Sequence, residues 1–441
     1  MYSFDPALKA KSVFKERFVW MLFMAITFFL LYGAANQYAG ITAPHLSFWM
    51  EWEKKIPFVP VFIVPYMSSD LMFVIAFLLP YTRLELRVLA VRVLFIVIVS
   101  VIFFLIFPLQ FSFEKPVIDS YTFLFSLLEA DLPYNQAPSL HIAFAIILWV
   151  SMRKYLHNIW LRVLVPMWLW LIALSTLLVY QHHFIDLPLG AFVALAGIYF
   201  FDEDRISVWT KSFSTPRSLK MGLYYLITAS IFMILAFVWQ SFTYLFLWFF
   251  LSLFSVSIVY AFGLNNFLAG KDAKAKHWQY FLFAPYFVGN YVSWQYYKRK
   301  IPLFVAVDKN IYFGRFPSKN EYQILKKQGI KHCVNLATEQ QVQKQIIAQT
   351  RLAFLDQTIQ SPESLHEAVL LIEKYKKELV YVHCALGLSR SVLVLSAWLL
   401  YKGKTVEEVE KTMIKIRPLY VKSAYMSINL EMYKTWLERK V

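Results

Sequence analysis

Long apolar runs constrain the fold of this chain more than any other feature of its sequence. A helix needs roughly 17–25 apolar residues to cross the hydrocarbon core of a bilayer. Eight runs, two of them short, lie near 18–36, 57–80, 88–108, 139–152, 160–180, 186–201, 221–239 and 242–263. A ninth, 278–295, contains Pro285, Gly289 and Asn290, which favour an interfacial or re-entrant segment. With 59% hydrophobic and 16% charged residues, the sequence predicts a polytopic α-helical membrane domain with eight or nine transmembrane helices.

The basic residues follow the positive-inside rule if the N-terminus is cytoplasmic. Lysines and arginines precede the first run and follow the second, fourth, sixth and eighth runs. The net charge of +16 then suits an anionic membrane surface or an anionic substrate. No basic stripe with exposed aromatic residues stands apart from the apolar runs, so we expect no nucleic-acid partner. These features predict a multi-pass membrane protein with a cytoplasmic N-terminus.

The composition changes near residue 300. Short strand-like runs at Ile311–Phe313, Cys333–Leu336, Leu352–Leu355 and Leu379–Val382 alternate with helical patterns. This alternation predicts an α/β domain whose sheet has parallel strands covered by helices. We therefore expect a membrane core over 1–201, additional helices and a linker over 202–299, and a separate catalytic domain over 300–441.

A cysteine motif lies inside this predicted domain. Residues 379–391 read Leu-Val-Tyr-Val-His-Cys-Ala-Leu-Gly-Leu-Ser-Arg-Ser, which places Cys384 between a buried strand and the start of a helix. The backbone N–H groups of such a loop favour an anion and the reactive thiolate. Arg390 can bind two phosphate oxygens at once. The other loop residues expected to support the phosphate or the thiolate are His383, Gly387, Ser389 and Ser391.

The motif resembles the dual-specificity branch of the protein tyrosine phosphatase superfamily, whose signature is His-Cys-x5-Arg followed by Ser or Thr. The resemblance covers roughly 300–441 and implies a phosphocysteine intermediate and an aspartate as general acid. A polar residue near Ser361 occupies the usual position of the acid, and Ser361-Pro362 instead indicates a helix N-terminus. We therefore expect Asp356, at the end of the preceding strand, to act as the acid. Its Leu-Asp-Gln-Thr context is similar to that of a lipid-directed member of the family.

Two polar clusters interrupt the apolar half of the chain. One is Pro138-Ser139-Leu140-His141, and the other extends from Ser175 to Asp186. Ionisable residues at membrane depth are costly and indicate function. One helical turn would place His182 and Asp186 on the same face, so that the carboxylate supports His182 as a nucleophile. His141 could then protonate the leaving alkoxide, and Ser139 could hold the phosphate.

These clusters resemble the type-2 phosphatidic acid phosphatase superfamily over roughly 1–200. The second motif of that family, Pro-Ser-x-His, is complete, whereas Thr176 replaces the arginine of the third motif. The first motif is reduced to Lys115-Pro116, and Lys115 is taken as a phosphate-binding residue. The Pro-Ser-Leu-His form also occurs in inositolphosphoryl-sphingolipid synthases, so transfer of a phosphoryl headgroup is an alternative to hydrolysis.

The sequence as a whole predicts a membrane phosphatase with two catalytic sites that acts on lipid phosphates without a metal or cofactor. The cysteine site is expected in the cytoplasm, where thiols stay reduced, unless 278–295 spans the bilayer. Three alternatives remain open: a lipid headgroup phosphotransferase, a phosphatase for phosphotyrosine or phosphoserine proteins, and a non-enzymatic phosphate-binding scaffold. Protein partners are not predicted.

Overall fold

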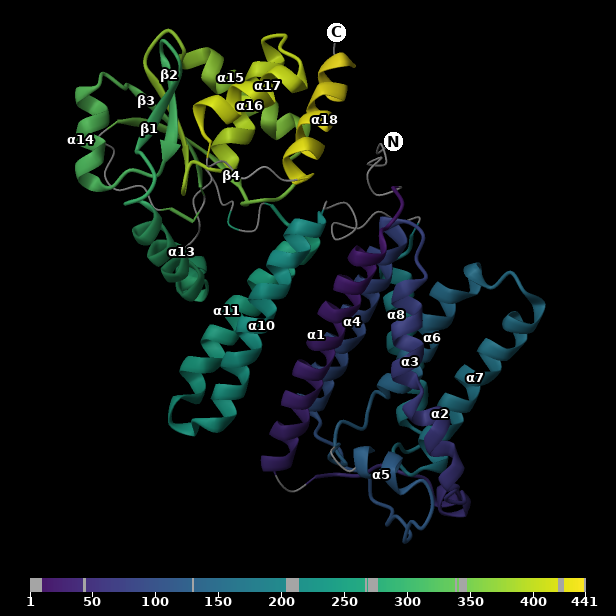
Figure 1. The fold of residues 1–441 in the computed structure, drawn as a ribbon. Helices are drawn as coiled ribbons and strands as arrows, with labels where there is room; N and C mark the ends of the chain where they lie inside the picture. Colours follow the sequence, from purple (N-terminus) through teal and green to yellow (C-terminus); the bar gives the residue numbers. More distant parts are fainter. Residues whose placement is uncertain are drawn as a thin grey trace. The chain divides into compact units, whose positions relative to one another are not determined.

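The chain forms two compact units, Met1–Lys211 and Ser212–Val441. A computed structural model describes residues 10–42, 45–128, 131–203, 214–265, 268, 277–337, 339–340, 347–418 and 424–439. The first unit is helical, and the second contains all the strands together with further helices (Figure 1). The three-part division expected at 201 and 299 stays a prediction.

Among the described residues, six helical segments are long and apolar enough to cross a membrane. They are Phe14–Ile41, Pro60–Leu78, Arg83–Ile106, Ile159–Leu178, Pro216–Val238 and Gln240–Phe262. The predicted runs 139–152 and 186–201 form shorter helices, α6 (Leu140–Met152) and α8 (Asp186–Phe200). The predicted total of eight or nine spans is therefore not confirmed.

In the first unit, α4 (Arg83–Ile106) packs against α1 (Phe14–Ile41), α6 and α8. The other α-helices in the described part of this unit are α2 (Ile63–Met67), α3 (Ser69–Leu78), α5 (Thr122–Leu128) and α7 (Ile159–Leu178). More of α4 is buried than of the other spanning candidates in this unit, so it forms the centre of the bundle.

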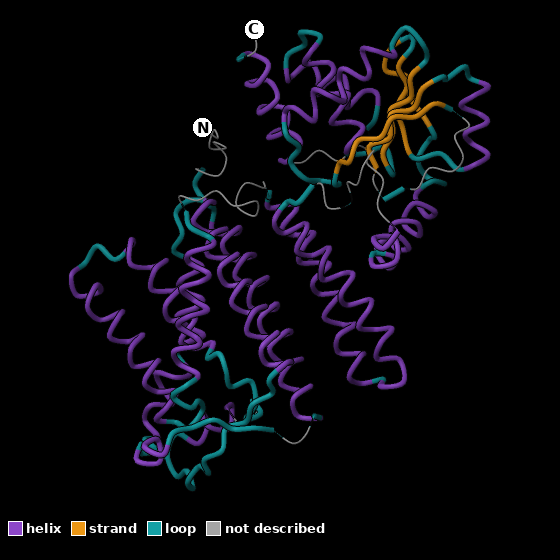
Figure 2. Tube along the Cα trace, turned by 180° about the vertical axis from the view of Figure 1, so that it is seen from behind, coloured by secondary structure: helices purple, strands orange, loops and turns teal. Residues whose placement is uncertain are grey.

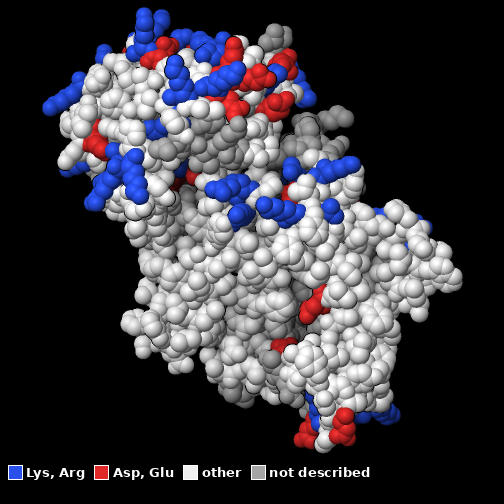
Figure 3. Space-filling model, viewed as in Figure 1, with Lys and Arg blue, Asp and Glu red and all other residues white. Residues whose placement is uncertain are grey.

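Charged side chains gather at the end of the first unit where α1 and α4 begin. Arg83 pairs with Glu16 at 3.0 Å, and Lys154 pairs with Glu85 at 3.0 Å. Thr82 and Glu85 form a capping box that starts α4. Figure 3 shows lysine and arginine side chains in a band at this end and a largely uncharged surface beside it. The distribution agrees with a bundle that has one basic end.

The second unit contains a five-stranded mixed sheet in the order β1-β2-β5-β3-β4. The strands are β1 (Phe304–Asp308), β2 (Ile311–Arg315), β3 (His332–Ala337), β4 (Ala348–Phe354) and β5 (Val380–Cys384). The four predicted strands are confirmed, and β2, β5, β3 and β4 are parallel. Sequence analysis missed β1, because it enters through a short antiparallel hairpin with β2 rather than through a βαβ crossover.

Helices cover both faces of the sheet. Figures 1 and 2 show α14 (Lys319–Lys327) on one side, and α15 (Pro362–Tyr375), α16 (Arg390–Tyr401), α17 (Val406–Ile416) and α18 (Ala424–Glu438) on the other. Nearly all of α16 is buried. Ser361 caps α15, with Pro362 in the first turn, and Thr405 caps α17 with Glu408, as predicted.

Several α-helices precede the sheet in the described part of the second unit. The hairpin of α10 (Pro216–Val238) and α11 (Thr243–Phe262) is followed by α12 (His277–Leu282) and α13 (Ala284–Tyr297). The ambiguous run 278–295 thus forms two short helices, and neither is among the six spanning candidates. The Trp294 indole in α13 donates to the Phe316 carbonyl oxygen at 2.9 Å, so α13 packs against the strand domain.

Replacing Gly190 with alanine is expected to destabilise the first unit. A Cβ atom there would lie 2.3 Å from the Ser139 carbonyl oxygen, where α8 crosses the start of α6. Overpacking of this kind costs about 1–3 kcal/mol. The midpoint of thermal unfolding of the full-length protein in detergent should fall. Gly33→Ala is the matched control, because nothing lies within 4 Å of its Cβ position, and it should not lower the midpoint.

Candidate active site

Cys384 lies at the point where the central strand β5 ends and the loop to α16 begins. The side chain is 2% exposed. The Gly387 N–H donates to Cys384 Sγ at 3.2 Å, and Ser391 Oγ lies 3.5 Å from the same sulfur. Both groups can stabilise a negative charge on the sulfur. The loop therefore has the geometry expected of a nucleophilic cysteine that also serves as a leaving group.

Gly387 allows this loop to close against β2. Its φ angle is +70°, and an added Cβ atom would lie 2.5 Å from the Gly314 carbonyl carbon. Any other residue would be strained in its backbone and would collide with the neighbouring strand. Ser389 Oγ lies 2.5 Å from the Tyr425 hydroxyl of α18, which anchors the other end of the loop.

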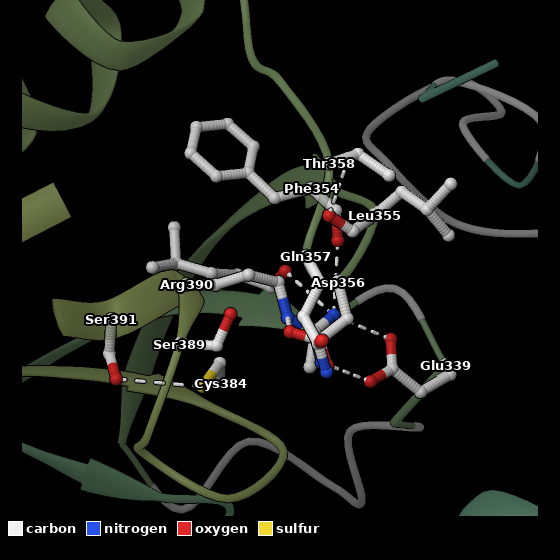
Figure 4. Close-up of polar contacts among 12 residues, drawn as sticks. Glu339, Phe354, Leu355, Asp356, Gln357, Thr358, Cys384, Ser389, Arg390 and Ser391 are labelled. Atoms are coloured by element: carbon white, nitrogen blue, oxygen red, sulfur yellow. Dashed lines mark hydrogen bonds and ion pairs between the residues drawn. The ribbon is translucent and has the colours of Figure 1, made fainter. Parts of the chain in front are cut away.

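The Arg390 guanidinium is buried beside two carboxylates, as Figure 4 shows. Its Nη1 atom donates to Glu339 Oε2 at 2.8 Å, Nη2 donates to the other oxygen of Glu339, and Nε lies 3.3 Å from Asp356 Oδ1. Burial works against the charge, but Glu339 and Asp356 raise the pKa of Arg390 well above its usual value. The guanidinium is thus charged and oriented without a substrate.

Asp356 follows β4, at the edge of the sheet where the carboxyl ends of the parallel strands meet, and its carboxylate pairs with Arg390. Its side chain is 33% exposed, compared with 4% for the side chain of Arg390. A group at the rim of the site can exchange protons with water between the two halves of a reaction. The structure brings Asp356 and Arg390 together, whereas Ser361 is the N-cap of α15.

His383 is fully buried against the rings of Tyr381 and Phe316. Burial lowers the pKa of its imidazole to about 3. His383 is therefore neutral at physiological pH, and its place directly before Cys384 suits a structural role in the loop.

A second polar site lies in the first unit. His182 Nδ1 is 3.2 Å from Asp186 Oδ2, and the same oxygen accepts from the His183 N–H at 3.0 Å. The expected single helical turn is wrong in detail, because α8 begins only at Asp186. A turn closed by the Asp186 N–H to the His183 carbonyl oxygen makes the pairing instead.

His141 joins this site from the start of α6. Its ring centroid is 5.9 Å from that of His182, and both side chains line a pocket of about 550 Å³. Most of the lining is aromatic or aliphatic, and its acidic members are Asp70 and Asp131. The two histidines thus meet at a mainly apolar pocket inside the helical bundle.

The other predicted phosphate ligands of the first unit lie outside this lining. Ser139 is fully buried, and its Oγ atom has no hydrogen-bond partner among the described residues. Lys115 is an exposed loop residue whose charge acts on Asp131. Thr176 donates to the Ala173 carbonyl oxygen at 2.7 Å and supplies no positive charge. The lining of the pocket contains no lysine or arginine among the described residues.

Sequence analysis missed several charged residues of the two sites. Glu339 follows β3. A charged residue just after a predicted parallel strand lies at the carboxyl edge of the sheet, and this position could have identified Glu339 as a site residue. Arg417 is 3% exposed and places a second guanidinium near the cysteine loop, over the Phe313 ring at 5.6 Å. In the first unit, Glu53 Oε2 lies 3.3 Å from His183 Nδ1, and no motif indicated this pair.

A family model for the dual specificity phosphatase catalytic domain matches residues 311–434. No curated protein matches the chain. Similar solved structures include Tk-PTP in its active form, with 24% identity, 30% of this chain and 97% of that chain covered, and a TM-score of 0.29. PTPMT1 in complex with PI(5)P has 22% identity, with 32% of this chain and 100% of that chain covered and a TM-score of 0.29. Human DUSP28 has 20% identity, with 31% of this chain and 96% of that chain covered and a TM-score of 0.29.

The C-terminal part of this chain therefore carries a catalytic domain of the dual-specificity, protein tyrosine phosphatase type. The protein is a phosphatase that hydrolyses phosphate esters.

Replacing Gly387 with alanine is expected to abolish most of the phosphatase activity. The left-handed backbone costs a non-glycine residue about 1–2 kcal/mol, and the contact with Gly314 would also displace the loop. Gly403→Ala is a matched control, because Gly403 has φ +86° but open space around it. Measurement of kcat/KM on an aryl phosphate should show a large loss for Gly387→Ala alone. Equal activities of the two variants would contradict the role of the loop.

Iodoacetamide at neutral pH is expected to alkylate Cys384 and not Cys333. Cys333 is fully buried, and burial raises the pKa of its thiol to about 12, so it stays protonated and inert. Mass spectrometry should find one modified cysteine, and the phosphatase activity should fall in proportion to the modification. Tungstate should protect against both the modification and the loss of activity. The Cys333→Ala variant should be inactivated at the same rate as the unmodified sequence. Earlier labelling of Cys333 would contradict this assignment.

Proposed function

We propose that the protein is a membrane phosphatase that removes phosphate from lipid phosphates through Cys384. The observation that carries the proposal is the combination, in one compact unit, of the cysteine loop and a helical hairpin long and apolar enough to enter a bilayer. Attachment beside a bilayer raises the effective concentration of lipid headgroups at the site. Phosphatidylglycerophosphate, phosphatidate and polyprenyl diphosphates have suitable chemistry.

The site residues support a two-step mechanism. The Cys384 thiolate attacks phosphorus, an S–P bond forms, and the P–O ester bond breaks while Asp356 gives its proton to the leaving alkoxide. Arg390 and the loop N–H groups hold the phosphoryl oxygens. Asp356 then takes a proton from water, which attacks phosphorus and releases the Cys384 thiolate beside Ser391.

The cysteine domain is proposed to face the cytoplasm of a bacterial inner membrane. Basic residues gather at the end of the first unit where α1 begins, and Arg217 and Lys220 lie at the start of α10. Because α10 and α11 form a hairpin, both of its ends would lie on the same side of the membrane. The positive-inside rule and the need for a reduced thiol favour the cytoplasm.

A substrate panel tests this function with the full-length protein in lipid nanodiscs. Lipid phosphates should be hydrolysed more efficiently than phosphotyrosine or phosphoserine peptides, and Cys384→Ser should abolish phosphate release. Asp356→Asn should lower kcat by about 10²–10⁴. Cys333→Ala is the control and should stay active. Preference for the peptides would favour a protein phosphatase, and phosphate binding without turnover would favour a scaffold.

The site formed by His182, Asp186 and His141 in the first unit supports a second candidate function, phosphoryl transfer between lipids. His182 has the carboxylate partner of a nucleophile, His141 lies nearby, and the pocket is mainly apolar. Without lysine or arginine in the described lining, the pocket is better suited to a neutral lipid alcohol than to a free phosphate.

Transfer would depend on His182 and on an acceptor lipid alcohol, but not on Cys384. In nanodiscs that contain a radiolabelled phospholipid donor and a lipid alcohol, His182→Ala should eliminate the labelled product, and Cys384→Ser should leave it. If no labelled product forms from the phospholipid donor and the lipid alcohol, this candidate function is rejected.

A further inference from the structure

The loop that carries Asp356 is held by residues that precede the phosphatase fold. Asn265, directly after α11, accepts at Oδ1 from Thr358 Oγ1 at 2.6 Å, and its Nδ2 atom donates to the Ile359 carbonyl oxygen. Arg217 in α10 donates from Nε to Gln357 Oε1 at 2.5 Å. Both Asn265 and Arg217 lie outside the residues 311–434 that match the catalytic domain.

Apolar contacts hold the same loop from the other side of Asp356. Leu355 is 2% exposed and packs in a cluster with side chains of the preceding helices. The buried members from α11, the segment after it and α13 are Val256, Val259, Tyr260, Leu268, Phe283 and Tyr286. Burial of a leucine side chain is worth about 1.5–3 kcal/mol, so this cluster contributes substantially to the position of the loop.

Three tyrosines extend this contact to the charged groups of the site. Tyr225 of α10 stacks on Tyr260 of α11 at 5.4 Å between ring centroids, and it lies 5.9 Å from Tyr286 of α13. Tyr286 is close enough to Glu339 and Arg390 to interact with their charges. The preceding helices therefore contact the loop that carries Asp356, and Tyr286 lies within the electrostatic range of Glu339.

The backbone of the loop also needs support from outside. Gln357 has φ +56°, a left-handed conformation that is unfavourable for a side chain of this kind. Such residues cost about 1–3 kcal/mol and persist when the surrounding structure holds them. The hydrogen bonds to Gln357, Thr358 and Ile359 and the packing of Leu355 supply that support.

We propose that the helices α10, α11 and α13 complete the phosphatase active site, with Asn265 as the main positioning residue and Arg217 as a second. They hold the loop 355–360 so that Asp356 points to the leaving group. The proposal rests on the function of Asp356 as the general acid. Catalysis by the C-terminal domain then depends on helices that would otherwise serve only to attach it to the membrane.

The experiment compares leaving groups on the full-length protein in nanodiscs. 4-Nitrophenolate leaves without a proton, whereas phenolate from phenyl phosphate needs one from the acid. Asn265→Ala is expected to lower kcat on phenyl phosphate by about tenfold or more, part of the 10²–10⁴ that a general acid supplies. The change on 4-nitrophenyl phosphate should be less than about threefold, and the limb of the pH profile that requires the protonated acid should weaken.

Variants of Thr358 test whether its hydrogen bond to Asn265 is responsible for the effect on kcat. Thr358→Val removes the hydroxyl that donates to Asn265 and should reproduce the effect, whereas Thr358→Ser keeps it and should restore most of kcat. The double variant Asn265→Ala, Thr358→Val should lose less activity than the product of the two single losses, because both variants remove the hydrogen bond between Thr358 and Asn265. Asn290→Ala is the matched control, since Asn290 Nδ2 donates to the Tyr286 carbonyl oxygen of its own helix.

Inhibition by tungstate separates positioning from loss of structure. The oxyanion binds the cysteine loop, so its inhibition constant should be unchanged in Asn265→Ala. Weaker tungstate binding together with an equal loss on both esters would show that Asn265 only stabilises the fold and would overturn the proposal. A leaving-group effect in Asp356→Asn but not in Asn265→Ala would also overturn it. No such effect in Asp356→Asn would instead reject Asp356 as the acid.

Discussion

The buried charge of Arg390 is the interaction on which the C-terminal active site depends. A guanidinium at 3% exposure is stable only if negative groups and hydrogen-bond acceptors surround it. Glu339 follows β3, Asp356 follows β4, and the Phe354 carbonyl oxygen accepts from Nη1 at 3.0 Å. The charge therefore ties the ends of three parallel strands together. The same groups that balance it also prepare the site for a phosphate.

The loop after β4, which carries Asp356, has contacts to helices outside the sheet. Asp356 is the most exposed of the three charged groups and follows a strand at the edge of the sheet. An edge strand has one neighbour only, so the loop beyond it has little support within the sheet. Asn265, Arg217 and the cluster around Leu355 provide contacts from helices on another part of the chain. The apolar helices and the catalytic loop are thereby linked in one unit.

Much of the fold followed from local patterns. The strands around Cys333 and Cys384, the Ser361 cap and the Thr405 capping box depend on neighbouring residues, and all are confirmed. The number of spans was harder to predict, because hydropathy does not separate a short buried helix such as α6 from a membrane-spanning one. The strand β1 was missed because a hairpin at a sheet edge has a weak pattern.

The sequence alone determined the apolar helices, the α/β alternation and the cysteine loop, because each depends on the type and spacing of residues close together in the chain. It also placed Asp356 and His182 among the candidate site residues. Only the tertiary structure decided that Glu339 would pair with Arg390, that Glu53 would pair with His183, and that Asn265 would contact the loop that carries Asp356. These partners are 51, 130 and 93 residues apart in the chain. No local pattern encodes contacts that arise only when distant segments pack together.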